Sequence, residues 1–324
     1  MSHSPQRPLK VVALGGGHGL AASLRALRHV TADITAVVTV ADDGGSSGRL
    51  RQELDVLPPG DLRMALAALC AQSDWGVTWR DVLQHRFSST GPLNGHAVGN
   101  LLIVALWELL GDPVAGLELI GELLGAEGRV IPMAAVPLEI EADVSHDGWA
   151  HSQTIRGQSR VAVTSGHVHK LRLQPPDAPA RPEAIEAIHE ADWVILGPGS
   201  WYTSVLTHLL VPGLAHALRT STAKVGLTLN LASQPGETGG FSAADHVRVF
   251  QQYAPEQRID TVIADPSAVE DLDDLNDTAK GVGARVLYRQ VSAGDGSARH
   301  DSLRLAAAYR DVFEGTLGDV GNHS

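Results

Sequence analysis

The chain has 324 residues, 44% of them hydrophobic, and a formal net charge of −12 at pH 7. This length and apolar content suffice for one large α/β domain and exclude a largely disordered chain. No run of Lys or Arg is present, so the charge argues against a nucleic-acid-binding protein. The single cysteine, Cys70, excludes an intramolecular disulfide, and its apolar surroundings predict a buried, inert thiol.

Residues 1–8 are polar and lead directly into an apolar run, without the charged segment, separate apolar segment and cleavage site of an export signal. The most apolar stretch, 97–110, contains Asn100 and Glu108 and falls short of the roughly 20 residues that span a bilayer. We therefore expect no membrane span and a cytoplasmic protein.

Five apolar runs rich in β-branched residues predict strands. They are, in chain order, 10–14, 34–40, 193–196, 224–229 and 259–264. The first three are each followed by a Gly-rich turn and helical spacing, which is typical of βα units in a parallel sheet. The fold class predicted is α/β, with a Rossmann-like, doubly wound and mainly parallel sheet.

The segment between the second and third runs departs from this pattern. Residues 61–125 have helical spacing, with Asp61 as an expected N-cap and Gly111 and Gly125 as expected helix ends. Residues 130–173 predict short added strands, antiparallel pairing being one option. The signals are the segments 136–142 and 160–163 and the turn dipeptide Asp147-Gly148. We expect a single domain over 10–316, with 61–125 as a helical insertion and 130–173 as added strands, between tails at 1–9 and 317–324.

A glycine motif follows the first strand. Segment 17–22 (GHGLAA) satisfies G-x-G-x-x-A before a helix, so its backbone N–H groups could face a phosphate. Asp42 lies 23 positions beyond Gly19, close to the roughly 20 at which dinucleotide folds place a ribose-binding acid. Asp42 or Asp43 could instead hold a divalent cation such as Mg²⁺. The plain alternative is that the glycines only turn the chain.

Further polar residues follow in this half of the chain. Segment 44–49 (GGSSGR) offers backbone donors, hydroxyls and a guanidinium suited to an anion, although a linker has a similar composition. Arg63 either lies on the surface or reaches the site. Asn100, one turn inside an apolar helix, needs a hydrogen-bond partner and is a candidate ligand contact.

A second strand, glycine loop and helix occur at 193–210, with the loop at 197–200 (GPGS). Two such loops suit a diphosphate. Asn230 and segment 234–238 (QPGET) follow the next strand. Because the carboxyl ends of parallel strands share one edge of a sheet, we expect these loops to meet there, although a plain capped loop is the alternative.

Six motifs occur together, at 13–20, 38–49, 60–63, 95–100, 197–204 and 234–238. In combination they resemble the YvcK family of gluconeogenesis factors, relatives of the CofD-type 2-phospho-L-lactate transferases, from Lys10 to about Tyr309. The resemblance implies a CofD-like fold, a cytoplasmic location, and a role in cell shape and wall synthesis on gluconeogenic carbon. It also implies binding of UDP-sugars such as UDP-N-acetylglucosamine, with Arg299 as a candidate contact. Family members commonly carry Thr in place of His18, which bears on ligand choice.

Together these arguments give one set of candidate ligand-binding positions. They are Gly15, Gly16, Gly17, His18, Gly19, Asp42, Asp43, Ser46, Ser47, Arg49, Asp61, Arg63, Asn100, Gly197, Pro198, Gly199, Ser200, Thr203, Asn230, Gln234, Glu237, Thr238 and Arg299. Asp42 and Asp43 are also the candidate metal ligands. No catalytic residue is assigned.

Three functions stay open. Anion-binding loops without an evident nucleophile or general base favour a regulatory protein that binds a nucleotide sugar and changes its affinity for a protein partner. The relation to CofD offers a transferase that moves a phospho-lactyl-type group from a nucleotide diphosphate donor with Mg²⁺. The G-x-G-x-x-A motif and the acid that follows also suggest an NAD-dependent oxidoreductase. The oligomeric state is open, a homo-oligomer included.

Overall fold

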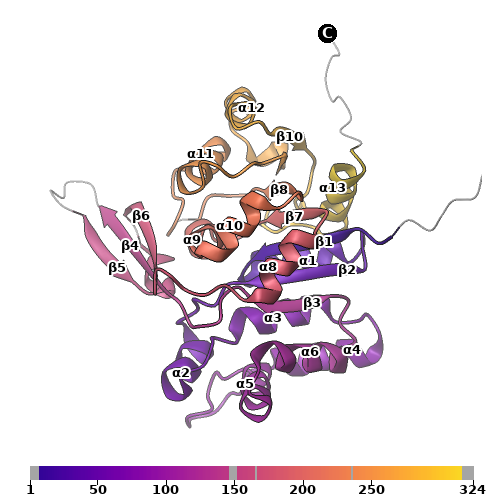
Figure 1. Cartoon of the computed structure of the whole chain (residues 1–324), viewed down its shortest axis with the longest axis vertical. Helices are drawn as coiled ribbons and strands as arrows, with labels where there is room; N and C mark the ends of the chain where they lie inside the picture. The colour runs from indigo at the N-terminus through magenta and orange to yellow at the C-terminus, as the bar shows by residue number, and fades with distance from the viewer. Residues whose placement is uncertain (1–6, 146–151, 165, 235, 316–324) are drawn as a thin grey trace, which may run out of the picture.

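The computed structural model of the chain describes residues 7–145, 152–164, 166–234 and 236–315. A seven-stranded parallel sheet forms its centre, in the order β10-β9-β8-β7-β1-β2-β3 (Figure 1). The strands are β1 Lys10–Gly15, β2 Asp33–Val38, β3 Arg129–Pro132, β7 Trp193–Leu196, β8 Lys224–Thr228, β9 Thr261–Ala264 and β10 Arg285–Tyr288. Parallel sheets are covered on both faces, which explains the nearly continuous apolar runs of the central strands.

The sequence predicts five of these strands, each to within two residues at either end. The structure corrects two points at the sheet edges. β3 was expected among the added strands, but it pairs with β2 in the main sheet. β10 was not predicted, and it pairs with β9 at the opposite edge. The doubly wound α/β prediction itself is confirmed.

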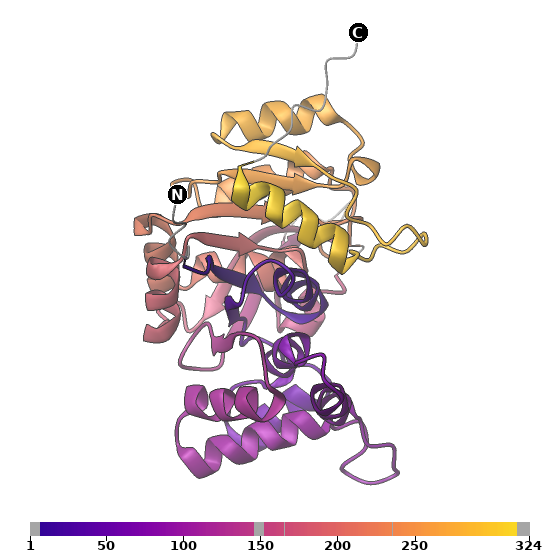
Figure 2. The same ribbon diagram turned by 90° about the vertical axis from the view of Figure 1, so that its right-hand side faces the viewer.

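Helices cover both faces of the sheet. α1 (Gly17–Leu27) packs with α3 (Gly60–Leu69) and α13 (Ser302–Glu314) on one face, while α8 (Pro182–Glu190) and α10 (Pro212–Thr220) lie together on the other (Figures 1 and 2). Two further helices, α11 (Ala243–Tyr253) and α12 (Leu272–Gly281), accompany β9 and β10.

The strand order reverses between the neighbouring strands β1 and β7. From β1 the chain adds β2 and β3 on one side, and it later returns to add β7, β8, β9 and β10 on the other. The connections that follow β1 and β7 therefore leave for opposite faces of the sheet. In open α/β sheets, ligands bind in the crevice at such a reversal, beyond the carboxyl ends of the strands.

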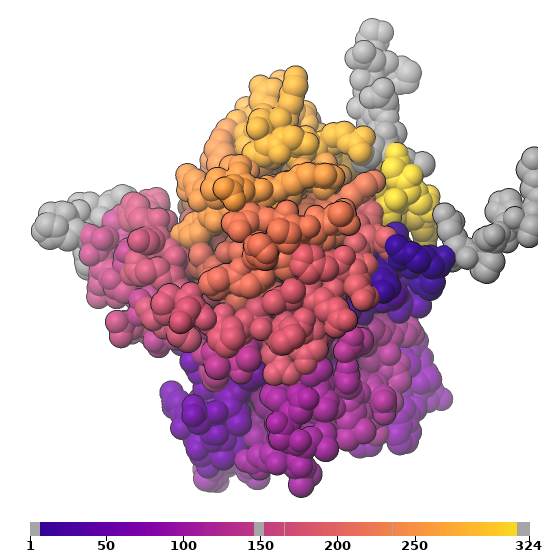
Figure 3. All heavy atoms as spheres, in the orientation of Figure 1, coloured from indigo at the N-terminus to yellow at the C-terminus, as the bar shows by residue number. Residues whose placement is uncertain are grey.

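A helical part extends beyond β2 and β3 (Figure 1), and its purple atoms form the lower end of the molecule in Figure 3. It contains α2 (Gly45–Leu54), α4 (Asp74–Gln84), α5 (Val98–Leu110) and α6 (Pro113–Leu124). Gly111 and Gly125 end α5 and α6 in the left-handed conformation, as predicted. The N-cap prediction for Asp61 is wrong, because α3 is preceded by Pro59 and Asp61 lies in its first turn.

A second, antiparallel sheet projects from the body in the order β5-β4-β6 (Figure 1). Its strands are β4 Glu139–Ser145, β5 Gln153–Arg156 and β6 His167–Gln174. The strand predicted over 160–163 is wrong, because the chain forms a single helical turn there, α7 (Gln158–Val161). The predicted Asp147-Gly148 turn and the tail at 317–324 lie outside the described residues.

Two sequence expectations about the chain as a whole can be compared with the structure. No described helix combines the length and the apolar character needed to cross a bilayer. Cys70 is buried at the end of α3, and burial raises the pKa of its thiol to about 11. A thiol with so high a pKa is a poor nucleophile at neutral pH, in agreement with the prediction.

A buried hydroxyl cluster fastens α13 to the rest of the sheet. The Tyr309 hydroxyl lies 2.8 Å from Ser23 Oγ on α1 and 3.2 Å from Thr228 Oγ1 at the end of β8. Ser23 Oγ also donates to the Gly197 carbonyl oxygen at 2.8 Å. These contacts link α1, α13 and the strand ends beneath the predicted ligand loops.

We expect Tyr309→Phe to lower the free energy of unfolding by about 1–2 kcal/mol, because two buried hydroxyls lose a partner. Urea denaturation measures this change. Tyr288→Phe is the matched control, since the Tyr288 hydroxyl makes only exposed hydrogen bonds, and its loss should stay below about 0.5 kcal/mol. Equal losses in the two variants would contradict the structural role of Tyr309.

Candidate nucleotide site

A cavity of about 770 Å³ lies at the carboxyl ends of β1, β7 and β8, at the point where the strand order reverses. Small-molecule sites typically have volumes of roughly 300–1,000 Å³. The predicted positions that line it are Gly16, Gly17, His18, Gly19, Asp61, Pro198, Gly199, Ser200, Asn230, Gln234 and Arg299. The structure therefore brings together the loops after three strands, with the segment before α13 as a further wall.

The loops after β1 and β7 are in direct contact. A Cβ atom at Gly19 would lie 2.2 Å from the Pro198 carbonyl oxygen and 2.5 Å from Gly199 Cα, so only glycine fits. Asn230, just beyond β8, holds the second loop through two hydrogen bonds. Its Oδ1 accepts from Gly199 N at 2.9 Å, and its Nδ2 donates to the Gly199 carbonyl oxygen at 2.8 Å. Three neighbouring strand ends thus fix one wall of the cavity.

The N-terminus of α1 faces a carboxyl group of the chain. The Gly17 N–H lies beside Asp61, while Asp61 Oδ2 is buried and has no hydrogen-bond partner among the described residues. Burial, together with the neighbouring Asp42, raises the pKa of Asp61 to about 7, against the opposing effect of the Gly17 N–H. Asp61 can therefore be neutral or charged near physiological pH, and its ionised form would repel an anion at this helix end.

The second anion site expected from the sequence is filled by a carboxylate of the chain. Glu237 Oε2 accepts from Tyr202 N at 2.7 Å and from Thr203 N at 3.3 Å, and Thr203 Oγ1 donates to Oε1 at 2.5 Å. These donors belong to a π-helical turn, Trp201–Val205, which is followed by the short α9 (Thr207–Leu210). The loop after β7 therefore shapes the cavity, but these two N–H groups are not free for a ligand.

Asn100 is part of a buried network inside the protein. Its Nδ2 donates to Ser46 Oγ at 3.0 Å, and its Oδ1 accepts from Arg63 Nε at 2.9 Å. Ser46 Oγ also lies 3.0 Å from His96 Nδ1, and Arg63 Nη1 donates to Gln84 Oε1. The expectation that Asn100 contacts a ligand is therefore corrected, because its amide is hydrogen-bonded to Ser46 and Arg63 and positions Arg63.

Asp42 adjoins Asp61 at the start of α3. A Cβ atom at Gly60 would lie 2.6 Å from Asp42 Oδ2 and 2.3 Å from Ser47 Oγ, so these groups converge on one backbone position. The described residues contain no group of three or more His, Cys, Asp or Glu arranged to hold a metal. A pair of carboxylates completed by phosphate oxygens and water is nevertheless an arrangement that Mg²⁺ accepts.

Asp43 and Arg49 face other parts of the chain. Asp43 Oδ1 accepts from Ser159 N at 2.8 Å at the start of α7. Arg49 donates to the carbonyl oxygens of Pro92 and Asn94, at 2.9 Å and 2.7 Å. The carboxylate that the structure places beside Asp42 is therefore that of Asp61. Asp42 does not line the cavity itself, so its placement does not support a ribose-binding role there.

Several cavity residues escaped the sequence prediction. Gln158, Arg25, His300, Asp301 and Ser302 all line it. Asp301 caps α13 by accepting hydrogen bonds from Leu303 N and Arg304 N at 3.0 Å and 2.9 Å. An Asp directly before helical spacing is a readable N-cap signal. Gln158 carries no such local signal, because α7 reaches the cavity only through the tertiary fold.

The pKa of Asp61 predicts a pH-dependent stability. In the folded protein Asp61 keeps its proton up to about pH 7, whereas its ordinary value is 3.8. Asp61 therefore lowers the stability of the wild type as pH rises from about 4 to 7. The variant Asp61→Asn lacks this titrating group. We expect the difference in unfolding free energy, Asp61→Asn minus wild type, to increase by on the order of 1–3 kcal/mol from pH 5 to pH 8.

Urea denaturation at several pH values measures this gain. The exposed Asp177→Asn, in the connection between β6 and α8, serves as the matched control for replacing an aspartate by an asparagine. If the difference in unfolding free energy between Asp61→Asn and the wild type did not change with pH, the raised pKa of Asp61 would be contradicted.

Known proteins share this fold. The family model of 2-phospho-L-lactate transferase CofD matches residues 11–287. A Mycobacterium tuberculosis protein named "Putative gluconeogenesis factor" is 51% identical, over 95% of this chain and 91% of the relative. The Bacillus subtilis "Gluconeogenesis factor" is 36% identical, over 95% and 99%. A crystal structure of a UPF0052-family protein from Bacillus halodurans has a TM-score of 0.83 and 32% identity, covering 94% of this chain and 99% of that one. The chain therefore belongs to the CofD family and, within it, to the gluconeogenesis factors that its motifs indicate.

Proposed function

We propose that the protein is a regulatory protein that binds a nucleotide sugar of the UDP-N-acetylglucosamine type in the cavity at β1, β7 and β8. Through this ligand it would support cell-wall synthesis and cell shape during growth on gluconeogenic carbon. The names of its relatives link the family to gluconeogenesis. The ligand class is supported by the chemistry of the cavity wall.

The observation that carries the proposal is a cluster of buried polar atoms that lack a partner. Asp61 Oδ2, Gln158 Oε1, Gln234 Oε1 and His300 Nε2 are buried, and none has a hydrogen-bond partner among the described residues. All four residues line this cavity. Buried polar atoms are almost always hydrogen-bonded in folded proteins, so their grouping indicates a polar ligand. Three of the four atoms are oxygens, which suits the hydroxyl donors of a sugar.

Other groups of the cavity suit the anionic part of such a ligand. The segment Gly16 to Gly19 opens α1, where backbone N–H groups and the helix dipole favour a phosphate. Arg299 carries a largely exposed guanidinium at the rim, next to Asp295 at 2.6 Å. A diphosphate could thus be held by backbone donors on one side and an arginine on the other.

Ligand binding would regulate the protein if the ligand had a higher affinity for one arrangement of the cavity walls than for another. The ligand would join loops that follow β1, β7 and β8 with the segment before α13, which are far apart in the sequence. A ligand that prefers the arrangement with these walls together stabilises that arrangement. A protein partner that recognises the same surface would then bind the liganded protein more tightly, by the difference in affinity that the ligand supplies.

Isothermal titration calorimetry with UDP-N-acetylglucosamine tests the proposal. We expect saturable binding by the wild type and about tenfold weaker binding by Arg299→Gln, the cost of one charge-assisted hydrogen bond. Arg285→Gln, at an exposed position on β10, should bind like the wild type. The proposal is wrong if neither this ligand nor any other UDP-sugar binds.

A transferase is the second candidate, favoured by the Asp42–Asp61 pair and the CofD match. An acceptor hydroxyl would attack a phosphorus of a nucleotide diphosphate donor, and a nucleoside monophosphate would leave. Asp42 and Asp61 fit the carboxylate half of a Mg²⁺ site, and the cation would neutralise charge that develops on the phosphate oxygens.

A transfer assay with radiolabelled donor separates this candidate from simple binding. We expect Asp42→Asn to lower the transfer rate by about 100-fold or more, because the cation loses a ligand. In Asp43→Asn, which changes a carboxylate that accepts from Ser159 N, most of the rate should remain. Transfer that survives Asp42→Asn would exclude the metal role of this residue.

A further inference from the structure

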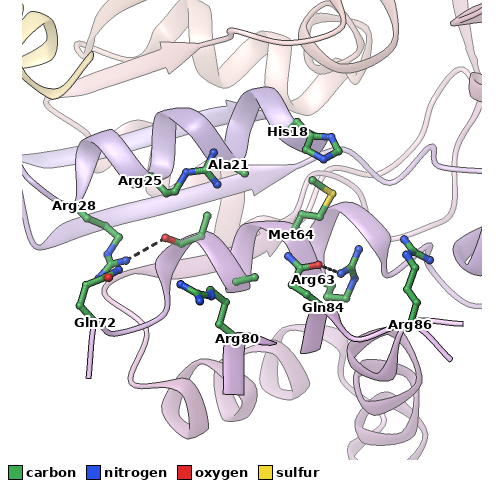
Figure 4. Close-up of a pocket in the computed structure, with 12 residues that line it drawn as sticks. His18, Ala21, Arg25, Arg28, Arg63, Met64, Gln72, Arg80, Gln84 and Arg86 are labelled. Atoms are coloured by element: carbon green, nitrogen blue, oxygen red, sulfur yellow. Dashed lines mark hydrogen bonds between the residues drawn. The ribbon is translucent and has the colours of Figure 1, made fainter. Parts of the chain in front are cut away.

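A second cavity, of about 600 Å³, lies beside the first, between α1, α3 and the end of α4 (Figure 4). His18 and Arg25 line both cavities. Five arginines line the second one, Arg25, Arg28, Arg63, Arg80 and Arg86, and its described lining residues include no Asp or Glu. In a chain with a formal net charge of −12, this wall is a local reversal of charge.

Two of these arginines are paired with acids. Arg28 lies 3.0 Å from Glu127, and Arg80 lies 2.8 Å from its neighbour Asp81. Figure 4 shows Arg25 and Arg28 extending from α1, with Arg80 on the opposite side of the cavity. The paired arginines contribute little net positive charge, so the excess resides in the other three.

Arg25, Arg63 and Arg86 make no ion pair with a described residue. Arg63 is only 3% exposed and donates to the amide oxygens of Asn100 and Gln84. Arg86 donates to a backbone carbonyl oxygen, that of Gly95, at 2.9 Å. Arg63 and Arg86 are thus held by neutral acceptors, and the Arg25 side chain makes no hydrogen bond with a described residue.

The buried guanidinium of Arg63 lacks a counterion in contact. A buried charge is costly unless it is paired, and neutral hydrogen bonds compensate only part of that cost. Burial, with a further contribution from Arg86, lowers the pKa of Arg63 to about 10, while Asp61 and Asp42 act in the opposite direction. A group with this pKa remains a cation at neutral pH, and the network through Asn100 holds it in place. An anion in the cavity would compensate its charge.

We propose that this cavity binds the phosphate group of a small phosphomonoester, as a site separate from the nucleotide-sugar cavity. Unpaired guanidinium groups approach it from α1, from α3 and from the segment after α4. A tetrahedral dianion can accept hydrogen bonds from several directions, whereas a single carboxylate is planar and carries one charge. His18 and Arg25 connect the two cavities, so this phosphate would lie next to the sugar-nucleotide ligand.

Calorimetric titration of the full chain with inorganic phosphate and methyl phosphate, in a phosphate-free buffer of low ionic strength, tests the site. We expect one bound phosphate per chain, and Kd values at least about tenfold higher for Arg25→Gln and Arg86→Gln. Both side chains are exposed, so the variants should fold, which circular dichroism checks. Arg285→Gln, remote from both cavities, should bind phosphate like the wild type.

Three results would overturn the proposal. The first is that the wild type binds neither probe. The second is that Arg299→Gln, which changes only the other cavity, loses phosphate binding while Arg86→Gln keeps it. The third is that succinate binds more tightly than phosphate. Because Arg86 lines only the arginine cavity, the outcome does not depend on whether a UDP-sugar binds in the other one.

Discussion

The contact between Gly19 and the loop after β7 is the constraint on which the cavity at the carboxyl ends of β1, β7 and β8 depends. Any side chain at Gly19 would collide with the Pro198 carbonyl oxygen. β1 and β7 are neighbours in the sheet, but the whole helical part and the whole small sheet lie between them in the sequence. The close contact sets the start of α1 against the second glycine loop. Asn230 then holds that loop from β8. The contact between these two loops therefore sets the position of this wall relative to the rest of the cavity.

Much of the fold could be predicted from the sequence because its strongest signals are local. An apolar run followed by glycines and helical spacing marks a central parallel strand without knowledge of its neighbours. The edge strands β3 and β10 begin with exposed arginines, Arg129 and Arg285. Strand preference at an edge depends on the partner strand and on burial, which the local sequence does not contain. The turn of α7 was missed for the same reason, since the Asp43 carboxylate that accepts from its N–H is distant in sequence.

In the candidate site, too, the sequence shows which polar groups need partners, but the partners come from distant parts of the chain. The sequence indicates that Asn100 needs hydrogen-bond partners, but Ser46 and Arg63 supply them, and no ligand is required. The sequence also indicates free N–H donors at the start of the helix after the second glycine loop, but Glu237 accepts hydrogen bonds from them. The pairing of Asp42 with Asp61 could not be anticipated from their spacing, because it depends on how α3 meets the loop after β2. Residue types are thus predictable, while their partners depend on tertiary structure.

The charges around α1 also restrict how a nucleotide sugar could lie in its cavity. His18 and Arg25 lie on the border with the arginine cavity, whereas Gln158 and Gln234 present buried oxygens without described partners. Phosphates are favoured near the cationic border, and hydroxyl donors are favoured near the unpaired oxygens. Asp61 lies at the helix end beside Gly17, where its ionised form would repel a phosphate. Proton uptake by Asp61 and phosphate binding would therefore favour each other, so the ligand itself would help to keep this buried carboxyl group neutral.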